Sequence, residues 1–232
     1  MVAERLSIIV PALNEAGGIA AALQRLQAWR PQVEVIVVDG GSDDATVAVA
    51  TPLADHVLVC ERGRARQMNA GAAKARGDAL LFLHADTALP DDAVTLVRLG
   101  LGATARAWGR FDVSIAGTSA LLAAVSMLMN ARSRMSGIAT GDQAIFVRRE
   151  AFDAVGGFPD IPLMEDVEIS QRLKAISPPL CIRSRAVTSA RRWERDGVLR
   201  TIVLMWRLRM AYAMGVSPAR LARRYGVERT ST

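Results

Sequence analysis

The first hundred residues alternate between short apolar runs and helical patterns, and this alternation limits the fold more than any other feature of the chain. Four runs are almost entirely apolar: 6–10, 33–38, 56–60 and 79–83. Such continuous hydrophobicity is typical of parallel strands that are covered on both faces. Helical spacing or helix-starting residues follow each run, at 18–29, from 43, at 65–76 and at 90–100. Strands that alternate with helices in this way predict an α/β fold with a doubly wound, mostly parallel sheet.

The order of the elements changes after residue 102. Strands are predicted at 108–115, 144–147 and 180–187, and helical segments at 119–132, 149–155, 165–176 and 198–214. No internal repeat or low-complexity linker separates these segments. We therefore expect one compact domain over residues 1–195 and a basic, amphipathic helical extension over residues 196–232.

The positive charge of the chain is concentrated at its C-terminal end. The net charge of the whole sequence is +6, yet residues 1–182 carry 17 basic and 20 acidic residues. Residues 183–232 carry 12 arginines and three acidic residues. A basic arm beside a slightly acidic body indicates a local anionic partner. We do not expect a nucleic acid, because the sequence contains no recognised nucleic-acid-binding module.

The sequence predicts a cytoplasmic protein. Cys60 and Cys181 lie in apolar runs and indicate neither a disulfide framework nor a zinc cluster, and no secretory signal pattern is apparent. Segment 198–214 contains three arginines, each costing about 2.5–3.5 kcal/mol at the centre of a membrane, so we do not expect it to span one. Two alternatives stay open for this helix: packing on the core, or peripheral contact with the inner face of the membrane.

Polar residues follow three of the predicted strands, at the edge where an open α/β sheet binds ligands. Asn14 and Glu15 follow the first strand, Asp39 the second, and His84 and Asp86 the fourth. Carboxylates gathered at one edge raise one another's pKa unless a cation or the hydrogen-bond donors of a ligand offset the repulsion. One interpretation is therefore a ligand site with a bound cation. The other is that Glu15 and Asp39 only cap the helices that follow them.

The sequence argues against NAD and ATP chemistry. The turn after the first predicted strand, residues 11–18, lacks the G-x-G-x-x-G pattern of a dinucleotide site, and the chain contains no Walker A sequence. A sugar nucleotidyltransferase would need a glycine-rich loop with an arginine at the same turn, and this loop is also missing.

Seven segments resemble, in sequence order, the signatures of family 2 glycosyltransferases. They are Pro-Ala-Leu-Asn-Glu (11–15), Val-Val-Asp-Gly-Gly-Ser (37–42), the stretch 68–78, Leu-Phe-Leu-His-Ala-Asp (81–86), and the stretches 141–149, 155–158 and 165–173. The resemblance covers about residues 5–175, and its details are similar to a small, soluble, bacterial branch of the family. It implies a GT-A fold and the inverting transfer of a sugar from a nucleotide diphosphate donor to a hydroxyl acceptor, either lipid-linked or a small molecule.

The resemblance also implies a donor and metal site. The loop that contains Pro11, Ala12 and Asn14, together with Glu15 and Asp39, would hold the nucleotide. Asp86 matches the second acid of the family's Asp-x-Asp motif and would bind Mn²⁺ or Mg²⁺ against the diphosphate. His84 replaces the first acid, and a neutral imidazole suits Mn²⁺ better than Mg²⁺. Two other interpretations of His84 are a hydrogen bond to the ribose or to an acidic neighbour, and a purely structural role.

The remaining site residues implied by the resemblance lie further along the chain. Asp166 matches the family's catalytic base, which takes the proton of the acceptor hydroxyl; alternatively, Asp166 and Glu165 only form an acidic helix start. The predicted donor and acceptor pocket also includes Arg64, Arg66, Asp142, Gln143 and Glu165. The Arg-Arg-Trp sequence at 191–193 loosely resembles an element that processive relatives place near the diphosphate, but the upstream glutamine of that element is absent. Because His84 departs from the metal motif, a catalytically silent nucleotide-sugar-binding protein is the alternative to an enzyme.

Overall fold

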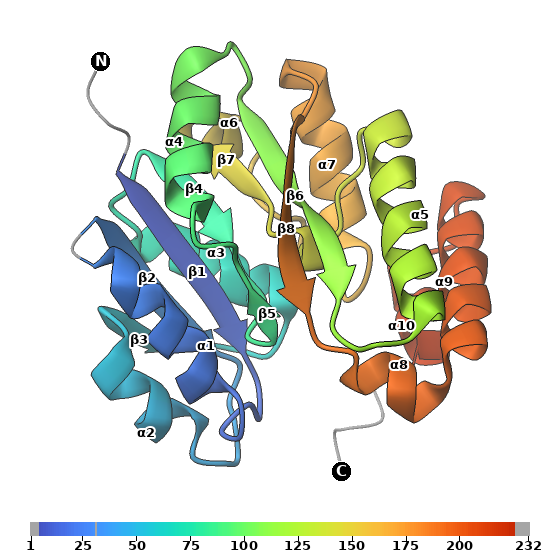
Figure 1. Cartoon of the computed structure of the whole chain (residues 1–232), viewed down its shortest axis with the longest axis horizontal. Helices are drawn as coiled ribbons and strands as arrows, with labels where there is room; N and C mark the ends of the chain where they lie inside the picture. Colours follow the sequence, from blue (N-terminus) through green and yellow to red (C-terminus); the bar gives the residue numbers. More distant parts are fainter. Residues whose placement is uncertain (1–4, 31, 226–232) are drawn as a thin grey trace.

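The computed structural model describes residues 5–30 and 32–225, and these residues form one mixed sheet with helices on both faces (Figure 1). The strand order is β3-β2-β1-β4-β7-β6-β8-β5. The strands are β1 Leu6–Ala12, β2 Val33–Asp39, β3 His56–Val59, β4 Ala79–Phe82, β5 Thr87–Ala88, β6 Trp108–Ile115, β7 Phe146–Arg148 and β8 Leu180–Thr188. The helices are α1 Ile19–Leu26, α2 Thr46–Ala50, α3 Arg64–Lys74, α4 Ala93–Ala103, α5 Ala120–Ser136, α6 Arg149–Ala154, α7 Glu165–Ile176, α8 Arg191–Asp196, α9 Val198–Ala213 and α10 Pro218–Tyr225.

The continuous apolar strands lie in the parallel half of the sheet, as predicted. β1 pairs in parallel with both β2 and β4, and β2 with β3. Successive side chains of β1 face opposite layers: Ile8 packs in the core with α1 and α4, whereas Ile9 packs in the core with α3 and α7. This two-sided burial explains why β1, β2 and β4 are almost entirely apolar rather than alternating, whereas the edge strand β3 is only partly buried.

The other half of the sheet is mixed. β7 runs antiparallel between β4 and β6, β6 pairs in parallel with β8, and β5 pairs antiparallel with β8. Of the seven strand pairings in the described residues, four are parallel and three antiparallel. Because β1, β2 and β4 are parallel, their carboxyl ends share one edge of the sheet. β7 runs in the opposite direction.

Two helices end later than their sequences indicate. Gly100 and Gly102 do not end α4, which continues to Ala103. A Cβ atom at Gly100 would lie 2.2 Å from the Leu180 side chain, so this glycine lets α4 pack closely on β8 instead of ending the helix. The predicted helix 119–132 continues to Ser136 and stops at Gly137, whose φ of +66° is the left-handed conformation typical of a helix C-terminus.

The C-terminal helices pack on the sheet domain. α9 contacts α5 through Val198, Ile202 and their neighbours, and it contacts α10 and the segment before α7 through Leu208 and Leu221. One face of α9 is therefore packed, while its opposite face is exposed. The predicted boundary between residues 195 and 196 falls at the end of α8 and stays a prediction, and residues 226–232 of the predicted extension lie outside the described residues. None of the described helices is long and apolar enough to cross a membrane.

Candidate active site

The loops after β1 and β2 are tied together at the carboxyl edge of the sheet. Asp39 is buried at the end of β2, and its Oδ2 accepts hydrogen bonds from the backbone N–H groups of Gly41 (2.8 Å) and Ser42 (2.7 Å). Ser42 Oγ in turn accepts the backbone N–H of Asn14 at 2.8 Å, and Asn14 Oδ1 accepts that of Asp43 at 2.9 Å. The structure thus brings the predicted residues Asn14 and Asp39 together, and it uses their polar groups to fix both loops.

A glutamine that was not predicted holds the same loops from below. Gln67 on α3 is buried, and its Nε2 donates to the carbonyl oxygens of Ala12 (2.7 Å) and Val38 (2.9 Å). Pro11 and Ala12 are part of β1, paired with Val38 and Asp39, so β1 continues beyond its predicted end at residue 10. These two predicted site residues therefore contribute backbone at the strand end.

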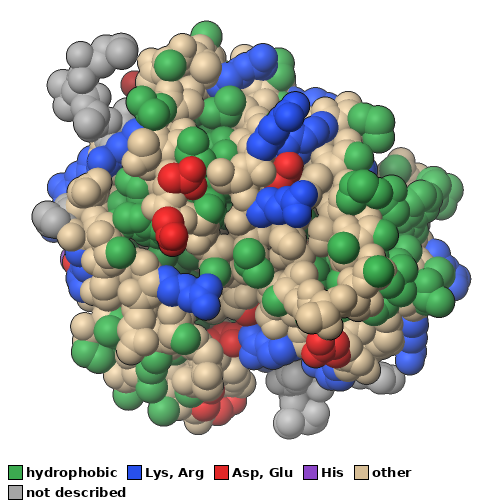
Figure 2. All heavy atoms as spheres, in the orientation of Figure 1, with side chains coloured by type: hydrophobic (Ala, Val, Ile, Leu, Met, Phe, Trp, Pro, Cys, Tyr) green, Lys and Arg blue, Asp and Glu red, His purple; other side chains and the backbone are tan. Residues whose placement is uncertain are grey.

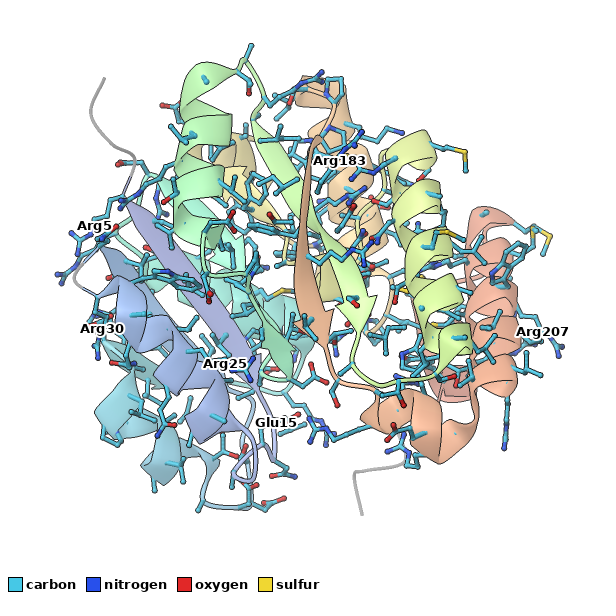
Figure 3. The ribbon with its side chains drawn as sticks, viewed as in Figure 1. Arg5, Glu15, Arg25, Arg30, Arg183 and Arg207 are labelled. Carbon is cyan, nitrogen blue, oxygen red and sulfur yellow. The ribbon has the colours of Figure 1, made fainter. Side chains whose placement is uncertain are left out.

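An arginine bridges two of the predicted acidic residues. Arg191 Nη2 on α8 lies 3.2 Å from Glu15 Oε2 and 3.7 Å from Asp86 Oδ2 (Figure 3 labels Glu15). Asp86 lies just after β4, and its carbonyl oxygen accepts the backbone N–H of Ser189 at 3.1 Å. Two like charges at one edge repel each other, and the guanidinium offsets this repulsion. In the sequence, this arginine was indicated only by the loose resemblance of Arg-Arg-Trp (191–193) to an element that processive relatives place near the diphosphate.

His84 is directed toward a different acid. Its Nδ1 lies 3.3 Å from Asp142 Oδ1, which is one of the alternatives that the sequence left open. His84 Nε2 is buried and has no hydrogen-bond partner within residues 5–30 and 32–225. A Cβ atom at Gly141 would lie 2.3 Å from this nitrogen, so residue 141 must be glycine for the imidazole to fit. Burial would raise the pKa of Asp142, but the hydrogen bond and charge of His84, with Arg64 and Arg192, lower it.

The predicted catalytic base lies at the start of α7. Asp166 Oδ2 accepts the backbone N–H of Gly141 at 3.0 Å, and its Oδ1 accepts that of Val167 at 2.8 Å. The adjacent Glu165 is buried, with its Oε1 3.7 Å from Arg64 Nη1. Burial and the charge of Asp166 raise the pKa of Glu165, although Arg64 lowers it in part.

A cavity joins four of the predicted site residues. It has a volume of about 10 Å³, and its lining includes Arg64, His84, Glu165 and Asp166. This volume matches about one water-sized probe. The cavity also has apolar walls from Met68, Phe82 and Phe158. Residues from α3, α7 and the segment after β4 therefore converge on one small space, although they are widely separated in the sequence.

Two predicted pocket residues lie elsewhere. The Gln143 side chain is buried, where its Oε1 accepts the backbone N–H of Thr140 at 3.2 Å. Arg66 is partly exposed and binds Asp160 at 3.0 Å and Glu61 at 2.7 Å. Both side chains form hydrogen bonds or ion pairs within the protein. Their contacts with a sugar donor or an acceptor substrate stay predictions.

The donor atoms near Asp86 suit a divalent cation that also binds phosphate. No group of three or more His, Cys, Asp or Glu side chains in the described part of the chain is arranged to hold a metal ion. However, Mg²⁺ sites in phosphoryl-binding proteins commonly use one or two carboxylates together with phosphate oxygens and water. Asp86 and Glu15, which share Arg191, fit this pattern without a complete protein cage.

This sheet, with carboxylates gathered at the carboxyl edge of its parallel half, is the GT-A type of α/β fold. A solved mannosyltransferase from Pyrobaculum calidifontis, in complex with GDP-Man and Mn²⁺, matches it with a TM-score of 0.62 and 22% identity, covering 90% of this chain and 61% of that one. The family model described as "Glycosyl transferase family 2" matches residues 7–119. This match, over about half of the chain, supports the resemblance to family 2 glycosyltransferases that the motifs predicted.

Two curated relatives show how far the similarity extends. The probable glycosyltransferase YdaM of Bacillus subtilis is 25% identical over 236 residues, which cover 91% of this chain and 55% of that protein. The dolichyl-phosphate β-glucosyltransferase of Drosophila melanogaster is 40% identical over 106 residues, which cover 37% of this chain and 32% of that protein. The chain thus spans about half the length of its Bacillus relative.

Proposed function

We propose that this protein transfers a sugar from a nucleotide diphosphate donor to a hydroxyl acceptor, with inversion and with a divalent cation. The observation that carries the proposal is the convergence on one cavity of Asp166, His84 and Arg64, at the end of β4, the strand that leads to Asp86. The match to the family 2 glycosyltransferase model supports it, as do the GDP-Man and Mn²⁺ bound by the archaeal neighbour.

Asp166 is well placed to act as the general base. Each of its carboxylate oxygens accepts one backbone N–H, which fixes the carboxylate and leaves lone pairs for an acceptor hydroxyl. Removing the hydroxyl proton as the new bond forms is the role of a base in an inverting transfer. Glu165, whose pKa is raised, remains neutral at a higher pH than an ordinary glutamate and so adds less repulsion beside Asp166.

The donor would lie along the fixed loops after β1 and β2. Asn14 and Asp39 define the nucleotide end of this surface, while Glu15, Asp86 and Arg191 define the diphosphate end. Asp86, with Glu15 beside it, would hold Mn²⁺ or Mg²⁺, whose chemistry is to neutralise negative charge that develops on the departing diphosphate. Arg191 would add its own positive charge at the same end.

The acceptor side borders a surface suited to the cytoplasmic face of a membrane. α9 and the residue that follows it expose an apolar stripe of Leu199, Val203, Trp206, Met210 and Met214, of which Trp206 is 70% exposed. Figure 2 shows hydrophobic side chains gathered over α5 and α9 at the right edge of the molecule, with arginines beside them. An apolar stripe flanked by positive charge complements an anionic bilayer surface. This surface supports peripheral contact with a membrane and a lipid-linked acceptor. The name of the Drosophila relative, a dolichyl-phosphate β-glucosyltransferase, is consistent with such an acceptor.

The change Asp166→Asn tests the proposed function. We expect the variant to bind nucleotide-sugar donors as the wild type does, as measured by the thermal shift with Mn²⁺. Its donor hydrolysis and sugar transfer should fall by about 100-fold or more, because the general base is lost. Asp153→Asn, which changes an exposed acid on α6, is the matched control and should retain full activity.

Two outcomes would contradict this assignment. Equal turnover by Asp166→Asn and the wild type would remove Asp166 from the mechanism. Donor binding without turnover by the wild type, with Mn²⁺ or Mg²⁺ present, would favour the silent nucleotide-sugar-binding protein. The anomeric configuration of the product, read by NMR, decides whether transfer inverts.

A further inference from the structure

A groove rich in arginine opens between α8, α9 and α10, separate from the cavity that Asp166 lines. Its volume is about 470 Å³. Five arginines line it together with a single acidic residue: Arg192, Arg195, Arg200, Arg223, Arg224 and Asp196. The lining therefore carries a formal charge of +4, concentrated in one concave surface. Like charges held this close repel one another, and a bound anion would offset the repulsion.

Among the described residues that line the groove, the one acid already has partners. Asp196 Oδ1 lies 2.8 Å from Arg195 Nε, and Asp196 Oδ2 lies 3.9 Å from Arg192 Nε. The positive charge of Arg200 also helps to lower the pKa of the Asp196 carboxyl. One carboxylate is thus shared among three guanidinium groups, so their positive charges exceed the negative charge of the acid they share.

Arg192, which lines the groove, has one N–H group without a hydrogen-bond partner in the described residues. Its guanidinium carbon lies 4.0 Å from the centre of the Tyr225 ring, and its Nη1 donates a hydrogen bond to the Tyr225 hydroxyl oxygen. The Nε atom, however, is buried and has no hydrogen-bond partner in the described part of the chain. A buried donor without a partner is costly, so this part of the groove suits a ligand that supplies acceptor oxygens.

We propose that this groove binds the phosphate or diphosphate group of a ligand, with Arg200 and Arg224 among its principal donors. Guanidinium groups present planar pairs of N–H donors that match phosphate oxygens, and such charge-assisted hydrogen bonds are about twice as strong as neutral ones. The proposal does not depend on the proposed sugar transfer, because it rests on groove residues outside the catalytic cavity.

The position of the groove allows two sources for the phosphate. Arg192 lines the groove, and the preceding residue Arg191 contacts Glu15 and Asp86 of the candidate active site, so the two sites adjoin. Arg200 lies on α9 beside the exposed apolar residues Leu199 and Val203. A soluble phosphate ester would use the arginines alone, whereas a lipid phosphate would place its chain along the apolar stripe of α9.

Arginine footprinting tests the site directly in the full-length protein. Phenylglyoxal modifies exposed arginines, and mass spectrometry measures the modification of each one with and without inorganic pyrophosphate. A chelator is added to remove divalent cations. Pyrophosphate binding near Asp86 should then be weak, because the proposed site there uses a cation. We expect pyrophosphate to protect Arg200 and Arg224 but not Arg207, which projects outward from α9 (Figure 3). Equal protection at Arg207, or none at Arg200 and Arg224, would overturn the proposal.

A pair of matched double variants gives an independent measurement. Arg200→Gln with Arg224→Gln removes two groove arginines, while Arg207→Gln with Arg220→Gln removes two exposed arginines from the same two helices outside the groove. By calorimetry, the groove variant should bind pyrophosphate about tenfold or more weakly, as expected for lost hydrogen bonds to a charged group. The control variant should lose much less.

Vesicle flotation identifies the source of the phosphate. If the groove takes lipid phosphates, vesicles of phosphatidylcholine with phosphatidic acid should recruit the groove variant less than the control variant. If only pyrophosphate binding depends on the groove, the ligand is a soluble phosphate ester. Either result supports a phosphate site, and equal behaviour of both double variants in both assays would refute it.

Discussion

Arg191 lies where the candidate site needs positive charge. One guanidinium nitrogen is within 3.2 Å of Glu15 and 3.7 Å of Asp86, so it serves two carboxylates from a third element. The arginine side chain is 63% exposed, and exposed ion pairs contribute only about 0–1 kcal/mol each. The guanidinium can therefore leave these acids at little cost when a cation binds there. Arg191 and a divalent cation should compete for the same oxygens.

The change Arg191→Ala should tighten Mn²⁺ binding in the absence of donor. Loss of the competing charge from two exposed pairs predicts a gain of roughly two- to fivefold. Electron paramagnetic resonance of free Mn²⁺ measures the affinity without relying on turnover. Arg195→Ala, on the same helix but paired with Asp196, is the control and should leave Mn²⁺ affinity unchanged. Unchanged or weaker Mn²⁺ binding by Arg191→Ala would show that the arginine does not compete with the metal.

Single residues of the site differ in how visible they are in the sequence. The positions of Asn14, Asp39 and Asp86 at one edge of the sheet were predictable, because each lies at or shortly after the end of an apolar strand and the carboxyl ends of parallel strands share an edge. Gln67 and Gly141 were not, because their roles depend on contacts with distant loops. Arg191 was signalled only by a loose motif, and its partner Glu15 lies 176 residues away in the sequence.

Close packing between elements positions the site from below. α3 lies against β1 and β2 at Gly71, where a Cβ atom would be 2.4 Å from the Ile9 side chain and 3.0 Å from that of Val38. Ile9 and Val38 are buried and β-branched, so neither can move aside easily. This contact holds Gln67 and Arg64, which lie on the same helix, at fixed positions relative to the strand ends.

The change Gly71→Ala should destabilise the protein despite the better helix propensity of alanine. Overpacking costs typically about 1–3 kcal/mol, which exceeds the roughly 1 kcal/mol that alanine gains over glycine in a helix. Gly102→Ala on α4 is the matched control, because nothing lies within 4 Å of its added Cβ, and it should be neutral or stabilising. Urea denaturation measures both, and a Gly71→Ala variant as stable as the control would contradict this account.

Elements with a clear period or a continuous apolar run were predictable, and short ones were not. β6 and α7 have the predicted bounds. β5 is only two residues long and exists through its pairing with Thr188 and Val187 of β8, a contact that no local pattern encodes. α10 buries only Leu221 and Ala222 among many arginines, so its sequence gives little sign of a packed helix.

At the scale of the whole molecule, charge and hydrophobicity divide between two sides. The parallel half of the sheet carries the acidic strand ends, whereas α8, α9 and α10 carry the arginine groove and the apolar stripe. The sequence left open whether segment 198–214 packs on the core or contacts a membrane. One face of α9 packs on α5 and α10, and the opposite face is exposed.

The exposed face of α9 should bind anionic vesicles in a salt-dependent manner. We expect flotation with phosphatidylglycerol vesicles to weaken as ionic strength rises, since screening reduces the attraction of exposed arginines. Trp206→Ser should reduce flotation further, because it removes the largest apolar side chain of the stripe. Val59→Ser, which changes an equally exposed apolar residue on β3, is the control. If neither a rise in ionic strength nor Trp206→Ser reduces flotation, the exposed face of α9 is not the surface that contacts the vesicles.

The hydrogen bonds between the loops after β1 and β2 have a consequence for the speed and selectivity of donor recognition. Asn14, Ser42 and Gln67 lock these loops into one shape during folding, before any ligand arrives. The entropy of ordering them is therefore lost in folding and not in binding. If the donor lies along these loops as proposed, its nucleotide meets a preformed surface, and a mismatched base cannot be accommodated by a change in the shape of the loops.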